Sequence, residues 1–347
     1  MPDIWAHILF GEEVISKIKD EMISWVEEYP ELFRFACQGP DFFFYYRFLP
    51  WYRSKNVNII GSKIHKEAGG EFVRSGIRYL KTLKSYPQLV DNSGDNIVEC
   101  VDYRLLVVYL MGLICHYALD TVTHPYIHYK CGVYRKDDHN THRYFGNHKF
   151  FEEILDTILL WEKRNLKTLK EPAYRQIDMG KNLPLSVLKF YQHQIDEFFA
   201  IQINKEILNR AYRDMVKAWK LFYDPHKLKV GIARILGVLS LSKFRYYQFF
   251  YPHTVDNSVD YLNRKQKKWC HPADKGEVYF ESFDQLWERA NEWAQRWIQG
   301  MVDYLRDRID DKHLNDLIPN LSFSSGKRPG EVDDERMKYF EPIINLK

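Results

Sequence analysis

The feature that most constrains the fold of this chain is a helix-length apolar run that ends in regularly spaced histidine and aspartate residues. The run covers residues 105–115 and leads directly into His116, Asp120 and His124, which are spaced by four. Residues four apart on a helix lie on one face, about 6 Å apart along the axis. A helix this apolar should be buried, and buried imidazole and carboxylate groups need hydrogen-bond partners or a metal ion.

A second pair with the same spacing, His148 and Glu152, opens the next helical segment, and six of the 13 histidines fall within residues 116–152. His116 and His124 would lie about 12 Å apart along the axis, too far to share one ion. Asp120 is therefore placed to bridge two ions, one beside each of these histidines. Mixed imidazole and carboxylate ligands suit zinc. The pattern predicts a multi-metal site, and the alternative is a polar core whose groups satisfy one another.

Composition and the N-terminal residues limit the classes of protein to which this chain can belong. A hydrophobic content of 45% with 28% charged residues is ordinary for a soluble globular protein, and a net charge of +3 is too balanced to indicate stable nucleic-acid binding. The five cysteines are odd in number and form no C-x-x-C pair, which favours reduced thiols. The first 20 residues lack the pattern of a signal peptide, and no apolar run is expected to reach the length that crosses a membrane, the best candidate being residues 230–250. We therefore expect a cytoplasmic protein.

Helical periodicity dominates the chain, so the expected fold class is all-α, a multi-helix bundle. One helical metal-binding domain is predicted over residues 1–317, with the ligands within residues 1–160 and a helical extension over residues 160–317. Residues 318–347, rich in Ser, Gly, Pro and charge, are expected to form a loosely packed tail. Pro125 is expected to end the long apolar helix. The predicted helices cover residues 12–28, 62–83, 96–124, 148–166, 185–198, 205–222, 227–250 and 282–308.

Three residues early in the chain are further candidate ligands, although the sequence evidence for each one alone is weak. They are His7, Asp41 after Gly-Pro, and His65. Their order, followed by the His116-x-x-x-Asp120 and His148-x-x-x-Glu152 pairs, resembles the zinc-dependent phospholipase C family over residues 1–158. That family has an all-helical fold and a three-zinc site in common with the S1/P1-type nucleases. The resemblance thus implies an all-α bundle that binds two to three Zn²⁺ ions.

The resemblance also implies how the ligands are shared among the ions. A first ion would be held by Asp41, His65, His116 and Asp120, and Asp120 would bridge to a second ion near His7. A third ion would take His148, Glu152 and a histidine that lies between the two helices.

This chain departs from the family pattern at the third ion and at the N-terminus. Secreted members place the third ligand two residues after a proline, where this chain has Ile127. His124 or His128 must substitute, and the helical spacing favours His124; His142 is a further candidate. Secreted members also use the free amine of an N-terminal Trp, whereas Trp5 here follows four residues, so that ligand is expected to be lost.

Three functions are consistent with these residues. The first is phospholipase C-like hydrolysis of a phosphate ester by metal-activated water, with Asp41 as ligand or general base and Asp120 as bridging ligand. The second is a nuclease or nucleotidase, since the same cluster serves both. The third is a non-catalytic helical protein with a structural zinc cluster. The aromatic residues 42–46 could line a site for a choline-like headgroup or for a stacked base, but core packing is the expected role of most of the five. The expected partners are a phosphate-ester substrate, including a phospholipid headgroup, and a membrane contacted peripherally.

Overall fold

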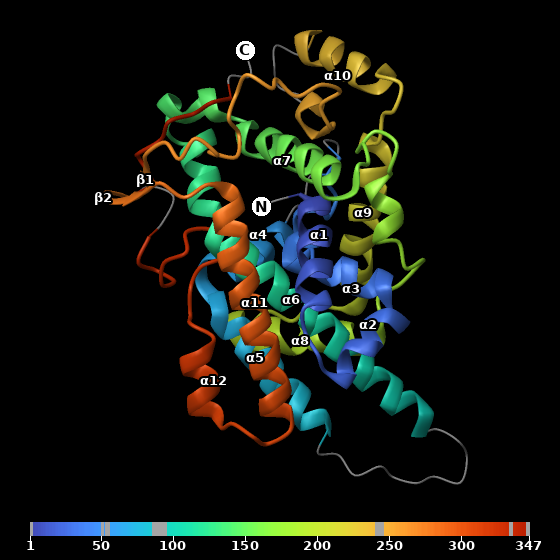
Figure 1. Ribbon diagram of the computed structural model, residues 1–347. Coiled ribbons are helices and arrows are strands. Elements are labelled where there is room, and N and C mark those ends of the chain that lie inside the picture. The colour runs from blue at the N-terminus through green and yellow to red at the C-terminus, as the bar shows by residue number, and fades with distance from the viewer. Residues whose placement is uncertain are drawn as a thin grey trace.

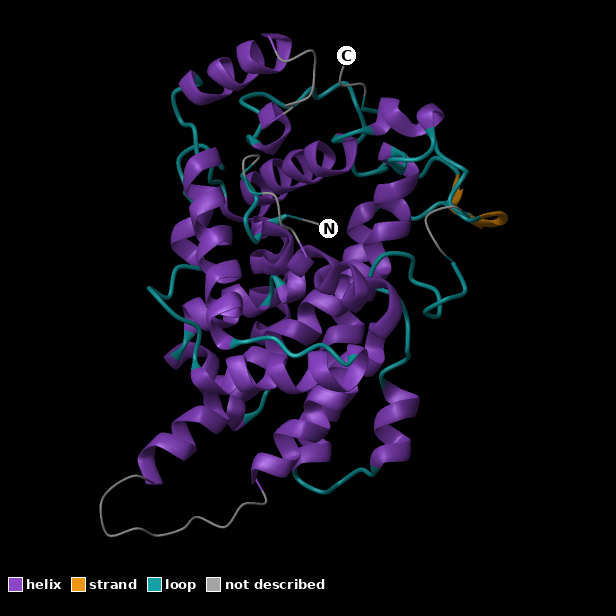
Figure 2. Cartoon of the chain, turned by 180° about the vertical axis from the view of Figure 1, so that it is seen from behind, coloured by secondary structure: helices purple, strands orange, loops and turns teal. Residues whose placement is uncertain are grey.

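The computed structural model describes residues 3–49, 52, 56–84, 96–239, 246–332 and 336–344. These residues form an all-α fold, as predicted, with one small hairpin at its edge (Figures 1 and 2). The α-helices are α1 (Ile4–Ser16), α2 (Ser24–Glu28), α3 (Pro30–Ala36), α4 (Asn56–Lys63), α5 (Gly69–Lys84), α6 (Asn96–Cys131), α7 (Asn147–Arg164), α8 (Leu185–Phe199), α9 (Lys205–Phe222), α10 (Leu228–Leu239), α11 (Phe283–Leu305) and α12 (Asp311–Leu317).

Helix α6 is the central helix of the fold. It packs against α1, α3, α5, α7, α8 and α11, which enclose its middle part (Figure 1). This enclosure explains why its sequence is apolar around the whole circumference rather than along one stripe. It also explains why the two ionisable groups of His116 and Asp120 are fully buried. The polar residues predicted on this helix therefore lie at the centre of the fold.

Two expectations about α6 were wrong. Pro125 does not end the helix, which continues to Cys131. Proline removes only its own N–H and leaves the carbonyl four residues earlier without a helical donor, which neighbouring structure can tolerate. In addition, the part Asp102–Cys131 is long and apolar enough to cross a membrane by length and composition, but 94% of its most apolar window is buried inside the protein. It forms the core of this fold.

Other helix boundaries also differ from the prediction. The expected helix over residues 12–28 is two helices, α1 and α2, separated by a turn and a 3₁₀ segment (Glu21–Ile23). Asp20 accepts a hydrogen bond from the Met22 amide and pairs with Arg306 at 2.6 Å, so a tertiary contact holds the break. The expected helix over residues 62–83 begins earlier, as α4, and passes through a π-helical segment (Ile64–Ala68) into α5.

The remaining predicted helices are close to those observed, with α9 identical in its bounds. The prediction over residues 227–250 is divided into α10 and a 3₁₀ segment (Tyr246–Phe249), and residues 240–245 lie outside the described part. Further 3₁₀ segments occur at Gly39–Tyr45, His139–Tyr144 and Ala173–Gln176. Strands β1 (Trp269–His271) and β2 (Asp274–Tyr279) form the antiparallel hairpin, in which Trp269 pairs with Tyr279.

The C-terminal segment is packed, contrary to the expectation of a loose tail. Ile318 and Phe323 are fully buried and belong to the same apolar core as the N-terminal helices. Further on, the amides of Glu341 and Ile343 donate to the carbonyls of Tyr129 and Lys130, at the end of α6. The segment therefore covers the part of α6 that carries the histidines.

Candidate metal centre

Five of the predicted ligands converge at one buried point, although they come from four separate elements. His7 lies on α1, Asp41 on the 3₁₀ segment Gly39–Tyr45, His65 on the π-helical segment, and His116 and Asp120 on α6. All five are at most 6% exposed. The donor atoms of His7, Asp41 and His116 lie within 4.8 Å of one another, as do those of His65, His116 and Asp120.

The two oxygens of Asp120 face different histidines. Oδ1 lies 3.4 Å from His7 Nε2, whereas Oδ2 lies 3.2 Å from His116 Nε2 and 4.0 Å from His65 Nε2. Asp41 closes the other side, with Oδ1 3.1 Å from His65 Nε2 and 3.8 Å from His116 Nε2. This is the arrangement expected of a carboxylate that bridges two cations.

Backbone carbonyls determine which nitrogen of each ring faces the cluster. His65 Nδ1 lies 2.7 Å from the Gly61 carbonyl and His116 Nδ1 lies 3.2 Å from the Cys37 carbonyl. A carbonyl only accepts, so Nδ1 must carry the hydrogen and Nε2 of the neutral ring presents a lone pair to the cluster.

Burial and the facing side chains keep His116 and Asp120 in the forms that bind metal. Desolvation lowers the pKa of His116 to about 4, against an opposing effect of Asp120, so its ring is neutral near pH 7. Burial acts to raise the pKa of the Asp120 carboxyl, but the facing His116 and His124 outweigh it and the pKa lies below its usual range. At neutral pH the centre therefore contains the neutral imidazole of His116 and the ionised carboxylate of Asp120.

Gly39 is required by the close packing around His116. Its φ is +51°, and a Cβ at this position would lie 2.2 Å from His116 Cδ2. Any side chain here would displace the ring and strain the backbone. Gly39 thus lets the 3₁₀ segment that carries Asp41 lie directly against α6.

A model of the zinc-dependent phospholipase C family matches residues 6–206, more than half of the chain. The chain belongs to the zinc-dependent phospholipase C family. The match includes every residue of the cluster described above and extends beyond the 1–158 range of the resemblance. Comparison with curated proteins found no significant match. Comparison with solved structures found none either.

The donor atoms fit the zinc that this phospholipase C family requires. His65 Nε2, His116 Nε2 and both oxygens of Asp120 are buried and have no hydrogen-bond partner among the described residues. With the Nδ1 hydrogens of His65 and His116 directed at backbone carbonyls, the Nε2 atoms of both neutral rings and Asp120 Oδ2 present lone pairs to one another and cannot satisfy one another. Cations at this point would supply the missing charge.

A second group of candidate ligands lies further along α6, facing α7. The donor atoms of His124, His148 and Glu152 lie within 4.8 Å of one another, and His148 Nε2 is 2.7 Å from Glu152 Oε1. His124 Nδ1 is 2.6 Å from the Phe323 carbonyl and 3.8 Å from Asp120 Oδ2, so this residue connects the two groups. His128 belongs here too, with its ring centre 4.9 Å from that of His148.

His142 does not lie in either group of candidate metal ligands. Its Nε2 lies 2.9 Å from the Lys136 carbonyl, and its ring packs against Tyr134 and His139 in the loop before α7. No group of converging donors among the described residues includes it. The residues between His142 and His148 form the end of a 3₁₀ segment and a turn, not a continuous α-helix. The His142 ring therefore does not share a face with His148.

Sequence reasoning missed two residues of this region. Cys131 lies with His128 and His148 in a third group whose donor atoms are within 4.8 Å of one another. Phe323 covers the cluster, with its ring centre 5.1 Å from that of His65 and 5.7 Å from that of His116. The spacing of three from His128 to Cys131 was a usable signal, but it required a helix that continues past Pro125. Phe323 had no local signal.

Proposed function

We propose that this protein hydrolyses a phosphodiester bond of a phospholipid headgroup, in the manner of a phospholipase C, with two or three zinc ions. The observation that carries the proposal is the buried convergence of acceptor atoms around Asp120, within the family match. Our proposed ligands are His7, Asp41, His65, His116 and Asp120 for two ions. A third ion would bind between α6 and α7.

The residues of the chain have distinct tasks in this proposal. Zinc ions would supply the Lewis acidity that activates water and stabilises charge on the phosphoryl oxygens. Asp120 holds a negative charge between the two ion positions. Asp41 lies at the edge of the cluster, where its carboxylate can orient the attacking water or accept its proton. Phe323 and the helices exclude bulk water, which strengthens these electrostatic interactions.

The aromatic run after Asp41 supports only part of the headgroup hypothesis. Phe42 and Phe43 are fully buried and pack against Tyr191, so they belong to the core. Phe44 is half-buried, with its ring centre 5.4 Å from that of His65. Phe44 is therefore the residue of this run that we propose to contact a choline-like headgroup.

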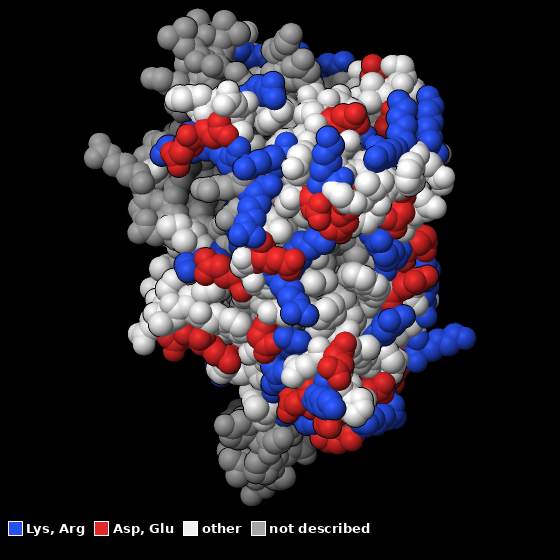
Figure 3. Space-filling view, turned by 90° about the vertical axis from the view of Figure 1, so that its left-hand side faces the viewer, with Lys and Arg blue, Asp and Glu red and all other residues white. Residues whose placement is uncertain are grey.

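The exposed face of α10 favours a lipid substrate over a nucleic acid. Leu228, Ile232 and Ile235 fall on one side of this helix and are 69%, 59% and 62% exposed. The exposed basic residues Lys227 and Arg234 flank the stripe. An apolar stripe with a basic flank is typical of a helix that lies in an anionic lipid interface. On the face shown in Figure 3, acidic and basic residues are intermixed rather than gathered into a basic surface.

One observation favours the non-catalytic alternative. The cluster is almost fully buried, and Phe323 covers it. A zinc centre with no open coordination position would stabilise the fold without catalysis.

The cytoplasmic location of the protein stays a prediction.

A panel of substrates tests these functions. Zinc-loaded wild type and Asp120→Asn are compared on p-nitrophenyl phosphorylcholine, bis-p-nitrophenyl phosphate and single-stranded DNA. Hydrolysis of the phosphorylcholine ester by wild type, lost in Asp120→Asn, is the expected result. Cleavage of DNA in preference to the choline ester would favour the nuclease. Failure of fully zinc-loaded protein to turn over any of the three would favour the structural centre.

A further inference from the structure

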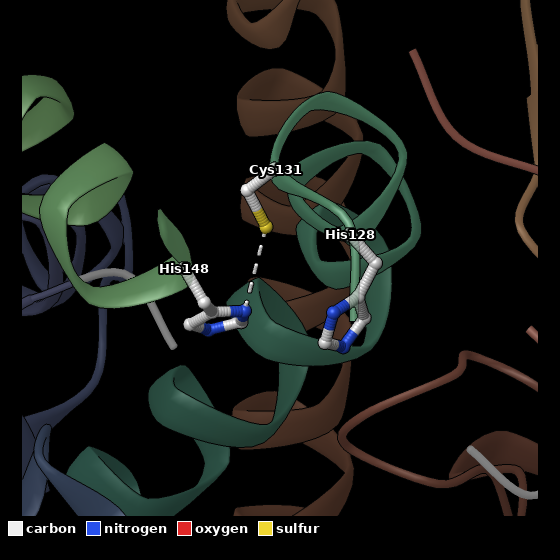
Figure 4. A group of neighbouring side chains, drawn as sticks. All are labelled: His128, Cys131 and His148. Carbon is white, nitrogen blue, oxygen red and sulfur yellow. Dashed lines mark hydrogen bonds between the residues drawn. The ribbon is translucent and has the colours of Figure 1, made fainter. Parts of the chain in front are cut away.

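The continuation of α6 past Pro125 places a thiol among the histidines of the second group. His124, His128 and Cys131 are spaced by four and three, so they lie on one face of the helix. Figure 4 shows His128 and Cys131 of this face beside His148 of α7. Cys131 Sγ lies 3.8 Å from His148 Nδ1, and the donor atoms of His128, Cys131 and His148 are all within 4.8 Å of one another.

We infer that Cys131 is a zinc ligand, and that it binds one ion together with His128 and His148 between α6 and α7. The inference rests on the zinc binding that is part of the proposed function, but it does not depend on which substrate is hydrolysed. It differs from the ligand set His124, His148 and Glu152, which contains no sulfur. A thiolate and two imidazoles are a suitable set for zinc, and three protein ligands leave a fourth position for water or substrate.

The surroundings of His148 fit this assignment. Its Nδ1 faces Cys131 and its Nε2 lies 2.7 Å from Glu152 Oε1. A ring that binds metal through one nitrogen commonly donates the hydrogen of the other to a carboxylate, which fixes the tautomer and the ring orientation. Glu152 would then orient His148 instead of binding the ion itself. Glu152 is buried, at 3% exposure, so its charge would also offset that of the cation.

Binding at this site is a proton exchange. Without metal, Cys131 is a buried thiol whose S–H donates to the Gly132 carbonyl at 3.3 Å. When the zinc–sulfur bond forms, the S–H bond breaks heterolytically, the sulfur keeps the electron pair and the proton is released to solvent. No redox partner is needed. A thiolate donates more charge than a carboxylate, so this ion would be a weaker Lewis acid than those beside Asp120.

Cobalt substitution tests the assignment without any measurement of activity. Wild type, Cys131→Ser and the matched control Cys270→Ser are loaded with Co²⁺, and their absorption spectra are recorded. Cys270 lies on β1, in the hairpin, and is in no group of converging donors among the described residues. We expect a sulfur-to-cobalt charge-transfer band in wild type and Cys270→Ser. In Cys131→Ser this band should be absent, while the d–d bands of cobalt in the other sites remain.

Zinc content and a second variant complete the test. Cys131→Ser should bind one zinc equivalent fewer than wild type, and His128→Ala, which retains the thiol, should lose the charge-transfer band as well. Cobalt binding with d–d bands but no charge-transfer band in wild type would overturn the Cys131 assignment and leave the proposed function intact. A band that survives in Cys131→Ser would also overturn it. Protein that binds neither cobalt nor zinc would overturn both the assignment and the zinc basis of the proposed function.

Discussion

Asp120 lies between the other candidate ligands of the centre. Its two carboxylate oxygens face separate histidines, and neither oxygen has a hydrogen-bond donor among the described residues. Two cations on either side of it would repel each other, and the shared negative charge offsets that repulsion. His7 Nε2 faces one of these oxygens, Oδ1, at 3.4 Å. The two residues should therefore differ in what their loss does to the bound metal.

We predict that Asp120→Asn loses more zinc than His7→Ala. The amide keeps the shape of the side chain but removes the charge that both ion positions share, whereas loss of His7 removes one ligand from one position. Elemental analysis of protein purified without chelator should find at least two zinc equivalents in wild type. Equal zinc content in the two variants would contradict the bridging role of Asp120.

At the scale of elements, α1 is held in register by α7. The Asp156 carboxylate accepts hydrogen bonds from the Trp5 and Ala6 amides, each at 2.8 Å, and from the Tyr251 hydroxyl at 2.9 Å. A buried carboxylate thus caps the first turn of α1, the helix that carries His7. The Trp5 nitrogen, which the family resemblance connects with a zinc ligand, is a helical amide bound to this carboxylate.

We predict that Asp156→Ala destabilises the protein by about 1–3 kcal/mol, because buried amides lose their acceptor. It should also weaken zinc binding, since α1 would no longer hold His7 in place. Chemical denaturation and zinc content measure the two effects. Asp310→Ala is the matched control: it removes the side chain that caps α12 but lies away from the cluster. Equal zinc loss in both variants would show that the effect is general destabilisation.

At the scale of the whole molecule, the chain returns at its C-terminal end to cover the centre that its N-terminal half builds. The Phe323 amide donates to the His65 carbonyl at 3.0 Å, and the Phe323 carbonyl lies 2.6 Å from His124 Nδ1. Gly326, with φ of +65°, passes close to the Thr121 carbonyl on α6, where a Cβ would lie 2.7 Å from the oxygen. The segment is thus fitted to the helix.

We predict that Phe323→Ala costs about 3–5 kcal/mol, because it opens a cavity in the core. The same cavity would admit water to the cluster, so zinc should transfer to a chelator faster. Phe340→Ala is the matched control, since Phe340 is half-buried and packs against Tyr144 rather than the histidines. The two variants are compared by denaturation and by the rate of zinc transfer. Unchanged transfer in Phe323→Ala would mean that this ring does not limit access.

The exposed stripe of α10 gives a prediction about lipid surfaces. Replacing Ile232 and Ile235 with Ser should reduce binding to vesicles that contain anionic phospholipid, because less apolar area enters the interface. Hydrolysis of a soluble phosphorylcholine ester should be unchanged. Phe280→Ser, which removes another exposed apolar residue, is the control and should bind vesicles like wild type. Equal vesicle binding by all three proteins would count against α10 as the membrane contact.

The sequence by itself determined the features that arise within one turn or two of a helix. The spacing of His116, Asp120 and His124, and that of His148 and Glu152, follows from the pitch of the α-helix, so their shared faces could be predicted. The apolar run before His116 likewise predicted a buried helix. These inferences needed no knowledge of the neighbours of α6.

Tertiary structure alone decided which of the distant candidates meet. His7, Asp41 and His65 lie on separate elements, and their sequence separation contains no information about distance once the helices pack. Packing also stabilises the continuation of α6 past Pro125. As a result Cys131 lies beside His148, whereas His142 lies outside the groups of candidate ligands. The burial of Phe323 has the same origin: a polar segment packs when a surface complementary to it already exists, and α6 with its neighbours provides that surface.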